Sequence, residues 1–317
     1  MRPRIVMLLA FVIAAVAVGF TGARFNIVPT PSPVVRSSLP PKASSYLGVF
    51  EPGSPPSYQP IEQFAEATDR EPNLIGYYSG WAEPFATSFA DMVYKHGLIP
   101  FVQIDPTLAS VSAIATGAYD VYLDTYAVAV RNFGHQVVIG FGHEMNSTSY
   151  SWGYGKTPPS TFVAAWRHIV TLFRSQGADN VTWLWTVQAD SSTTGPVASW
   201  WPGPSYVDWV GIDGYYNSPS DTFSRVFAPT ISAVRAFTDK PVLLSETAVT
   251  RRANQYANIV NLFEGMAKYK TLGLVWFDKD QLQQWEHQDW RIEGDLQAEA
   301  AFRASVSRLK LVSTGSH

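Results

Sequence analysis

Residues 136–155 read QVVIGFGHEMNSTSYSWGYG, and this stretch decides the fold. It opens with an apolar run from Val137 to Phe141 that is bounded by glycine, which is typical of a strand buried on both faces. The run ends in Gly142, His143 and Glu144. A carboxylate at the end of a buried strand is costly to keep charged unless it is paired or functional. Glu144 is therefore either a structural carboxylate at the mouth of a sheet or an acid in a pocket.

A second stretch has the same form. Residues 241–248 read PVLLSETA, in which the apolar run Val242–Leu244 ends in a serine and then in Glu246. If both strands belong to one parallel barrel, the two carboxylates face one pocket at its C-terminal end. Two carboxylates across a pocket are the groups that hydrolyse glycosidic bonds.

Composition narrows the function. The chain has 317 residues, a formal net charge of −3, no cysteine and 11 tryptophans. The near-neutral charge argues against a nucleic-acid partner, which would need a basic face. The missing cysteines exclude disulfides, thiol nucleophiles and thiolate metal sites. Many tryptophans suit a groove that stacks sugar rings on aromatic faces.

The N-terminus has the pattern of a targeting segment. Arg2 and Arg4 precede an apolar run from Ile5 to Phe20, so residues 1–23 are predicted to be a cleaved signal peptide or an uncleaved membrane anchor. Residues 24–45 are rich in Pro and Ser and are interpreted as a linker. We expect a monomeric domain that is secreted or extracellular, with membrane anchoring as the alternative.

The rest of the chain alternates strand-like and helical segments. Apolar runs rich in β-branched and aromatic residues occupy 46–50, 74–78, 98–104, 137–141, 181–187, 207–212, 242–244 and 274–277. Helical stripes between them end at Gly97, Gly134 and Gly177, and Thr157 with Pro158 is expected to begin the helix that ends at Gly177.

This alternation predicts a single-domain (β/α)8 TIM barrel over residues 46–311, followed by a tail at 312–317. The rival is a doubly wound open sheet with a phosphate-binding turn after its first strand. That turn would be EPGSPP at 51–56, whose prolines lack the N–H donors that a phosphate needs. The barrel is therefore favoured.

On the barrel assignment, Glu144 closes the fourth strand and Glu246 the seventh. The motif HEMN at 143–146, DWVGIDGY at 208–215, Glu246 and Trp276 together resemble glycoside hydrolase family 26, a family of retaining (β/α)8 glycosidases. The resemblance covers the predicted domain. It implies that Glu144 is the acid/base and Glu246 the nucleophile of a double displacement through a covalent glycosyl-enzyme intermediate.

The resemblance also implies substrate-binding residues. His143 would contact the sugar in the cleaved subsite, and Tyr215 would hydrogen-bond the nucleophile. Trp276 would form the floor of that subsite and Trp81 an aromatic wall. Asn146, the last residue of HEMN, is counted with them.

One part of the motif departs from the family. Where mannan-cleaving members have Trp and Phe, this chain has Ser149 and Tyr150, while Trp152 keeps the last Trp of the run. Tyr150 and Trp152 would then shape the subsite wall, which need not suit the axial 2-hydroxyl of mannose.

Other residues admit a structural interpretation. Asp105 and Asp213 also end strands, and we expect each to be structural more often than substrate-binding. The loop tryptophans are equally compatible with packing and with sugar platforms; they are Trp200, Trp201, Trp285 and Trp290. The scattered His135, His168 and His287 have no ligand spacing, so we expect neither a catalytic metal nor a cofactor.

The predicted function is a retaining, endo-acting glycoside hydrolase that cleaves a β-linked polysaccharide, with β-1,4-mannan expected from the family. A β-glucan is the alternative substrate, and a β-1,3-xylan is a more distant one. A transglycosylase on the same barrel and a non-catalytic glycan-binding barrel also remain open.

Overall fold

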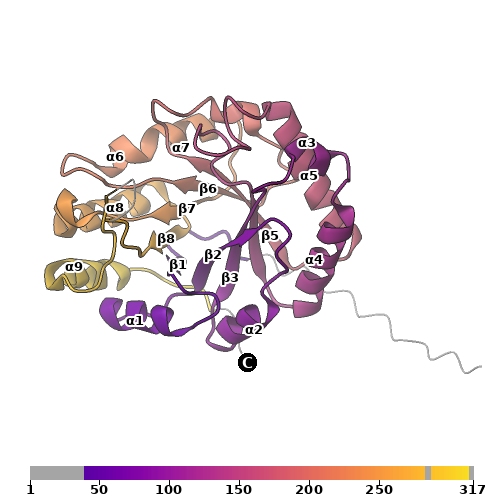
Figure 1. Cartoon of the computed structure of the whole chain (residues 1–317). Coiled ribbons are helices and arrows are strands. Elements are labelled where there is room, and N and C mark those ends of the chain that lie inside the picture. The colour runs from indigo at the N-terminus through magenta and orange to yellow at the C-terminus, as the bar shows by residue number, and fades with distance from the viewer. Residues whose placement is uncertain (1–38, 283–286, 314–317) are drawn as a thin grey trace, which may run out of the picture. The chain divides into compact units, whose positions relative to one another are not determined.

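The computed structural model describes residues 39–282 and 287–313, and it is a closed barrel of eight parallel strands (Figure 1). Strands pair in chain order and β1 pairs with β8, which confirms the predicted TIM barrel. The strands are β1 Tyr46–Phe50, β2 Leu74–Gly80, β3 Ile99–Asp105, β4 Val137–Phe141, β5 Val181–Gln188, β6 Trp209–Asp213, β7 Val242–Thr247 and β8 Gly273–Phe277.

The predicted targeting segment 1–23 and nearly all of the predicted linker lie outside the described residues. Within the part of the chain that the structure describes, no helix combines the length and the apolar character that crossing a membrane requires. The domain boundaries stay predictions.

Helices surround the barrel and bury their apolar stripes against it (Figure 1). They are α1 Gln59–Thr68, α2 Thr87–Lys95, α3 Val111–Ala115, α4 Asp120–Phe133, α5 Pro159–Ser175, α6 Phe223–Val226, α7 Ala228–Arg235, α8 Gln255–Tyr269 and α9 Leu296–Val306. The expected start of α5 differs in detail. Pro158 is the residue before the helix, and the Thr157 hydroxyl donates to the Ser151 carbonyl at 3.1 Å instead of capping α5.

The barrel interior changes character along its axis. At the N-terminal ends of the strands it is filled by large apolar side chains, including Tyr46, Leu74, Phe101, Leu184 and Trp209. Such a layer is a packed core and not a pore. The more polar layers of the barrel interior lie above this apolar layer.

Higher in the barrel the interior becomes polar. The Gln103 amide donates to the Thr186 hydroxyl at 2.9 Å, and Gly140 makes room for it, because a Cβ at 140 would lie 1.9 Å from Gln103 Oε1. Strand β4 thus keeps a glycine inside an apolar run because a buried amide needs the space.

Strand β7 contains one extra residue. Gly211 pairs with Leu243 and Asp213 with Glu246, so two steps along β6 match three along β7. A bulge of this kind re-aims side chains. As a result the neighbouring Ser245 and Glu246 both serve the barrel interior: the Ser245 hydroxyl donates to Asp213 and Glu246 lines the cleft above.

Candidate active site

A cleft of about 940 Å³ opens at the C-terminal ends of the strands. Its walls come from almost every strand end or following loop. They are formed by Tyr78, Asp105, His143, Glu144, Ser149, Tyr150, Gln188, Tyr215, Asn217, Glu246, Phe277, Gln281, Gln288 and Trp290. The two predicted catalytic acids therefore share one cleft, as expected for two residues that end parallel barrel strands.

Glu144 is held by an unusual backbone turn. After β4 the chain passes through Gly142 at φ +53° and then Glu144 at φ +52°, a left-handed conformation that is uncommon for a residue with a side chain. The Glu144 N–H donates to the Thr186 carbonyl at 3.0 Å, which anchors the turn to β5. Backbone strain of about 1–3 kcal/mol persists where the surroundings fix it, often at functional sites.

Two tyrosines hold Glu246. The Tyr215 hydroxyl donates to Oε2 at 2.7 Å, and the Tyr78 hydroxyl donates to Oε1. Burial, together with the charge of Glu246, raises the pKa of both tyrosines well above the ordinary value, so both hydroxyls keep their protons. Both carboxylate oxygens thus act as acceptors, as those of an ionised carboxylate do.

His143 is the positive group of the cleft. Burial lowers the pKa of His143, but the Asp105 carboxylate at 2.8 Å, with smaller contributions from Glu246 and Glu144, raises it to about 10. The resulting imidazolium donates from Nδ1 to Asp105 and from Nε2 to the Tyr150 hydroxyl at 3.0 Å. Asp105 therefore sets the charge of His143 and also lines the cleft.

Asp213 lies beneath the cleft and does not line it. Burial and then the charges of Glu246 and Glu144 raise the pKa of Asp213 well above the usual range, which favours its protonated form. It accepts from the Ser245 hydroxyl at 2.6 Å, and the Gly214 N–H donates to the Glu246 carbonyl at 2.9 Å. These contacts fit a structural role in which Asp213 supports β7 next to Glu246.

A family model described as Glycosyl hydrolase family 26 matches residues 75–279, which is more than half of the chain. The chain belongs to glycosyl hydrolase family 26. This confirms the resemblance carried by HEMN and by the second glutamate.

Three proteins are described here to which this family 26 chain is similar. It is 29% identical over 271 residues to Endoglucanase H of Acetivibrio thermocellus, covering 80% of this chain and 29% of that protein. It is 24% identical over 163 residues to mannan endo-1,4-beta-mannosidase A and B of Caldalkalibacillus mannanilyticus, covering 47% of this chain and 29% of that protein. The chain thus spans less than a third of the length of both proteins.

The third is a solved structure. The Cellulomonas fimi endo-beta-1,4-mannanase double mutant superimposes with a TM-score of 0.67 at 15% identity, covering 87% of this chain and 74% of that one. At this identity the likeness shows the fold alone.

Five of the nine predicted site residues line the cleft of this family 26 barrel: Glu144, Glu246, His143, Tyr215 and Tyr150. Two others stand behind them. The Trp152 indole N–H donates to the His143 carbonyl at 2.8 Å, and its ring stacks on Tyr150 with centroids 4.5 Å apart. Trp152 therefore positions the wall and does not form it.

Asn146 is likewise a positioning residue. It is fully buried, and its amide makes two hydrogen bonds to the Gln188 backbone: it donates to the carbonyl at 2.9 Å and accepts from the N–H at 2.8 Å. These bonds fix the end of β5, whose Gln188 side chain lines the cleft.

The predictions for Trp276 and Trp81 need correction. Trp276 is fully buried, packs edge-on against Phe302 of α9, and donates from its indole to the Asp278 carboxylate and the Trp290 carbonyl. Alternation along β8 turns Trp276 outward, and the next residue, Phe277, faces the cleft.

Trp81 is absent from the cleft lining because its ring is held elsewhere. It packs against Tyr119 and Tyr122, with centroids 5.3 and 5.1 Å away.

Residues outside the predicted site set complete the site, and one of them, Trp290, was left open by the sequence between packing and a sugar platform. Trp290 stacks on Tyr215 with ring centroids 4.6 Å apart and lines the cleft, which Trp276 does not. Of the other loop tryptophans, Trp200 and Trp201 pack in the helical layer, and Trp285 lies outside the described residues. Tyr78 was signalled only by its place at the end of an apolar strand.

We predict that His143 titrates near pH 10 in the folded protein and at lower pH in Asp105→Asn, because the amide carries no charge. The folded pKa exceeds the ordinary value of about 6.5. Protonation therefore stabilises the fold in full below about pH 6.5, and this stabilisation is lost as the pH rises towards 10. The measurement is a pH titration of ¹³C-labelled imidazoles by NMR.

The control for this titration is Asp120→Asn. It removes the carboxylate from a second His–Asp pair, Asp120 with the half-buried His168 at 2.6 Å, and should leave His143 unchanged. Titration of wild-type His143 near pH 6.5 would contradict the electrostatic account of the cleft.

Proposed function

We propose that the chain is a retaining, endo-acting glycoside hydrolase, with Glu246 as nucleophile and Glu144 as acid/base. The observation that carries the proposal is that two carboxylates from the ends of β4 and β7 share one cleft in contrasting settings. Glu246 is fixed by two tyrosine hydroxyls, and Glu144 sits on a strained turn beside His143. A retaining glycosidase needs two carboxyl groups with different tasks.

The setting of Glu246 suits a nucleophile. Attack at the anomeric carbon needs an ionised carboxylate in one orientation. Hydrogen bonds from Tyr78 and Tyr215 orient both oxygens, and buried Asp213 below, favoured in its protonated form, adds little competing charge.

The setting of Glu144 suits proton transfer. In the first step Glu246 bonds to the anomeric carbon while the glycosidic C–O bond breaks, and the leaving oxygen takes the proton of Glu144. In the second step Glu144 takes a proton from water, whose oxygen displaces Glu246 from the anomeric carbon. Two inversions give net retention. The His143 imidazolium lies beside both acids and limits the build-up of negative charge.

The cleft lining supports an uncharged polysaccharide as substrate. Among the described residues that line it, none is Lys or Arg, which an anionic glycan would need. The lining combines aromatic rings with amides, namely Trp290, Tyr150, Gln188, Gln281, Gln288 and Asn217. Aromatic surfaces with a few placed polar groups are typical of sugar subsites.

Two β-linked backbones have specific support. β-1,4-Mannan, the expectation from the sequence, is supported by the match to the mannan endo-1,4-beta-mannosidase. A β-glucan is supported by the match to Endoglucanase H, which extends over 271 residues against 163 for the mannosidase. It is also supported by Ser149, which lines the cleft where mannan-cleaving members carry a tryptophan.

The roles of the acids predict different mutant kinetics. Glu246→Ala should abolish turnover of every substrate. Glu144→Ala should lower kcat/KM on polysaccharide by about 10²–10⁴-fold, and far less on an aryl glycoside whose leaving group needs no proton. NMR of the first product should show the β anomer. Glu62→Ala, on the exposed face of α1, is the control. Equal losses for both acids on both substrates, or an α-anomeric first product, would reject the roles.

The substrate choice predicts a response at position 149. On a panel of mannan, glucomannan, lichenan, cellulose and xylan, we expect internal cutting of glucan or mannan. Ser149→Trp should raise the mannan-to-glucan ratio of kcat/KM about fivefold, because a sugar-stacking ring contributes on the order of 1 kcal/mol. Ser149→Ala should leave the ratio unchanged. Activity on xylan alone would refute the proposed substrate class.

We further propose that residues 1–23 direct the domain across the cytoplasmic membrane. The support is the basic, then apolar, then small-residue pattern of this segment, which lies outside the described residues. Cell fractionation with mass spectrometry of the N-terminus tests it. Cleavage near Ala23 identifies a signal peptide, and retention of the apolar run in the membrane identifies an anchor. A full-length protein in the cytoplasm would overturn the proposal.

A further inference from the structure

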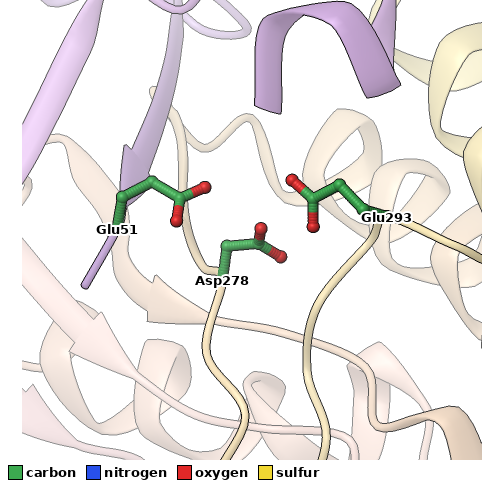
Figure 2. A group of neighbouring side chains, drawn as sticks. All are labelled: Glu51, Asp278 and Glu293. Carbon is green, nitrogen blue, oxygen red and sulfur yellow. The ribbon is translucent and has the colours of Figure 1, made fainter. Parts of the chain in front are cut away.

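Three carboxylates converge in a second hollow, which shares no described lining residue with the cleft. Glu51 follows β1, Asp278 follows β8 and Glu293 lies just before α9, yet one oxygen from each lies within 4.8 Å of the others. Figure 2 shows the three carboxylates turned towards a common point. Residues from opposite ends of the barrel domain meet here because β1 pairs with β8.

The cluster is buried, and part of it has no hydrogen-bond donor. Glu51 is 7% exposed and Asp278 is 3% exposed. Glu51 Oε1 is fully buried, has no hydrogen-bond partner, and belongs to the carboxylate aimed into the cluster (Figure 2). An unsatisfied carboxylate oxygen is costly to bury, so such a group calls for an unseen partner.

One positive side chain of this hollow, Arg291, is paired with carboxylates outside the cluster. Arg291 lines the same hollow but pairs with Asp289 at 2.9 Å and with Asp280 at 3.2 Å. Burial raises the pKa of Glu51 to about 8, and burial with the neighbouring carboxylates raises that of Asp278 well above its usual range. Three carboxyl groups therefore meet in one hollow, and they must either share protons or bind a cation.

We propose that Glu51, Asp278 and Glu293 bind a divalent cation that prefers oxygen ligands, with Ca²⁺ as the first candidate. Three carboxylates provide up to six oxygens, and Ca²⁺ takes six to eight oxygen ligands with tolerance of irregular geometry. The cluster contains neither His nor Cys, the ligands that favour Zn²⁺ and copper. Water completes the coordination shell.

The cation would brace one wall of the cleft. The segment between Asp278 and Glu293 carries Gln281, Gln288 and Trp290, which line the cleft. Asp278 also accepts from the Ile292 N–H at 2.8 Å, so the two ends of the segment already meet. A cation held by both ends and by Glu51 would fasten this segment to the end of β1.

The test uses the full-length chain stripped of metal with EDTA and dialysed, then titrated with CaCl₂ by calorimetry. We expect one ion per chain, with Kd on the order of 10⁻⁴ M, as in extracellular calcium modules, or tighter. Tm should rise by about 3–6 °C at a tenfold excess over Kd. Hydrogen exchange in residues 278–282 and 287–293 should slow.

Variants identify the ligands. Glu51→Gln and Glu293→Gln should each raise Kd at least tenfold, whereas Glu66→Gln should not, although Glu66 of α1 lines the same hollow. Equal binding by folded Glu51→Gln and wild type would overturn the site, and so would loss of binding in Glu66→Gln.

If the variants fail to fold, metal binding by the wild-type chain still tests the proposal. No binding and no Tm shift with CaCl₂, MgCl₂ or MnCl₂ would overturn the proposal. Binding is measured without a glycan, so the result does not depend on the proposed hydrolase activity.

Discussion

The extra residue in β7 is the constraint on which the cleft depends. Regular alternation would send either Ser245 or Glu246 out towards the helices. The bulge lets Ser245 bond Asp213 inside the barrel while Glu246 rises into the cleft between Tyr78 and Tyr215. The carboxylate is therefore positioned from below by the backbone of β7 and from the sides by two hydroxyls. Without the bulge, Glu246 would lose its orientation between the two tyrosine hydroxyls even if every side chain were kept.

Charge in the cleft is balanced by location. Asp105, Glu144 and Glu246 line it, and His143 is the imidazolium among them. Asp213, the acid buried beneath, does not add a fourth full charge, because burial and its neighbours favour its protonated form. Two aromatic residues also contact the positively charged His143. Tyr150 accepts from His143, and Trp152 holds both the ring of Tyr150 and the backbone of His143. His143, Tyr150 and Trp152 of this motif therefore hold one another in position.

The sequence predicted the barrel and the two acids because both follow from residue patterns that are visible in the sequence alone. Buried parallel strands are short apolar runs, and a Glu that ends such a run must lie at the barrel mouth. It could not say that Trp276 faces outward, since the strands of a barrel are apolar on both faces and their alternation is hidden. Tyr78 was missed for the same reason. Asn146 and Trp152 lie in the right motif, but their bonds go to backbone, which no residue pattern reveals.

The acidic cluster was hidden from sequence for a different reason, which is topological. Barrel closure pairs Phe50 with Phe277, and the next residues, Glu51 and Asp278, must then lie side by side, with the Asp278 N–H donating to the Phe50 carbonyl at 3.0 Å. Closing the barrel therefore forces two buried carboxyls together, and Glu293 joins them on the way into α9. Repulsion between these carboxylates, where β1 pairs with β8, opposes closure of the barrel. Only a shared proton or a bound cation offsets it, and a cation also fastens the segment that carries Trp290 over the cleft.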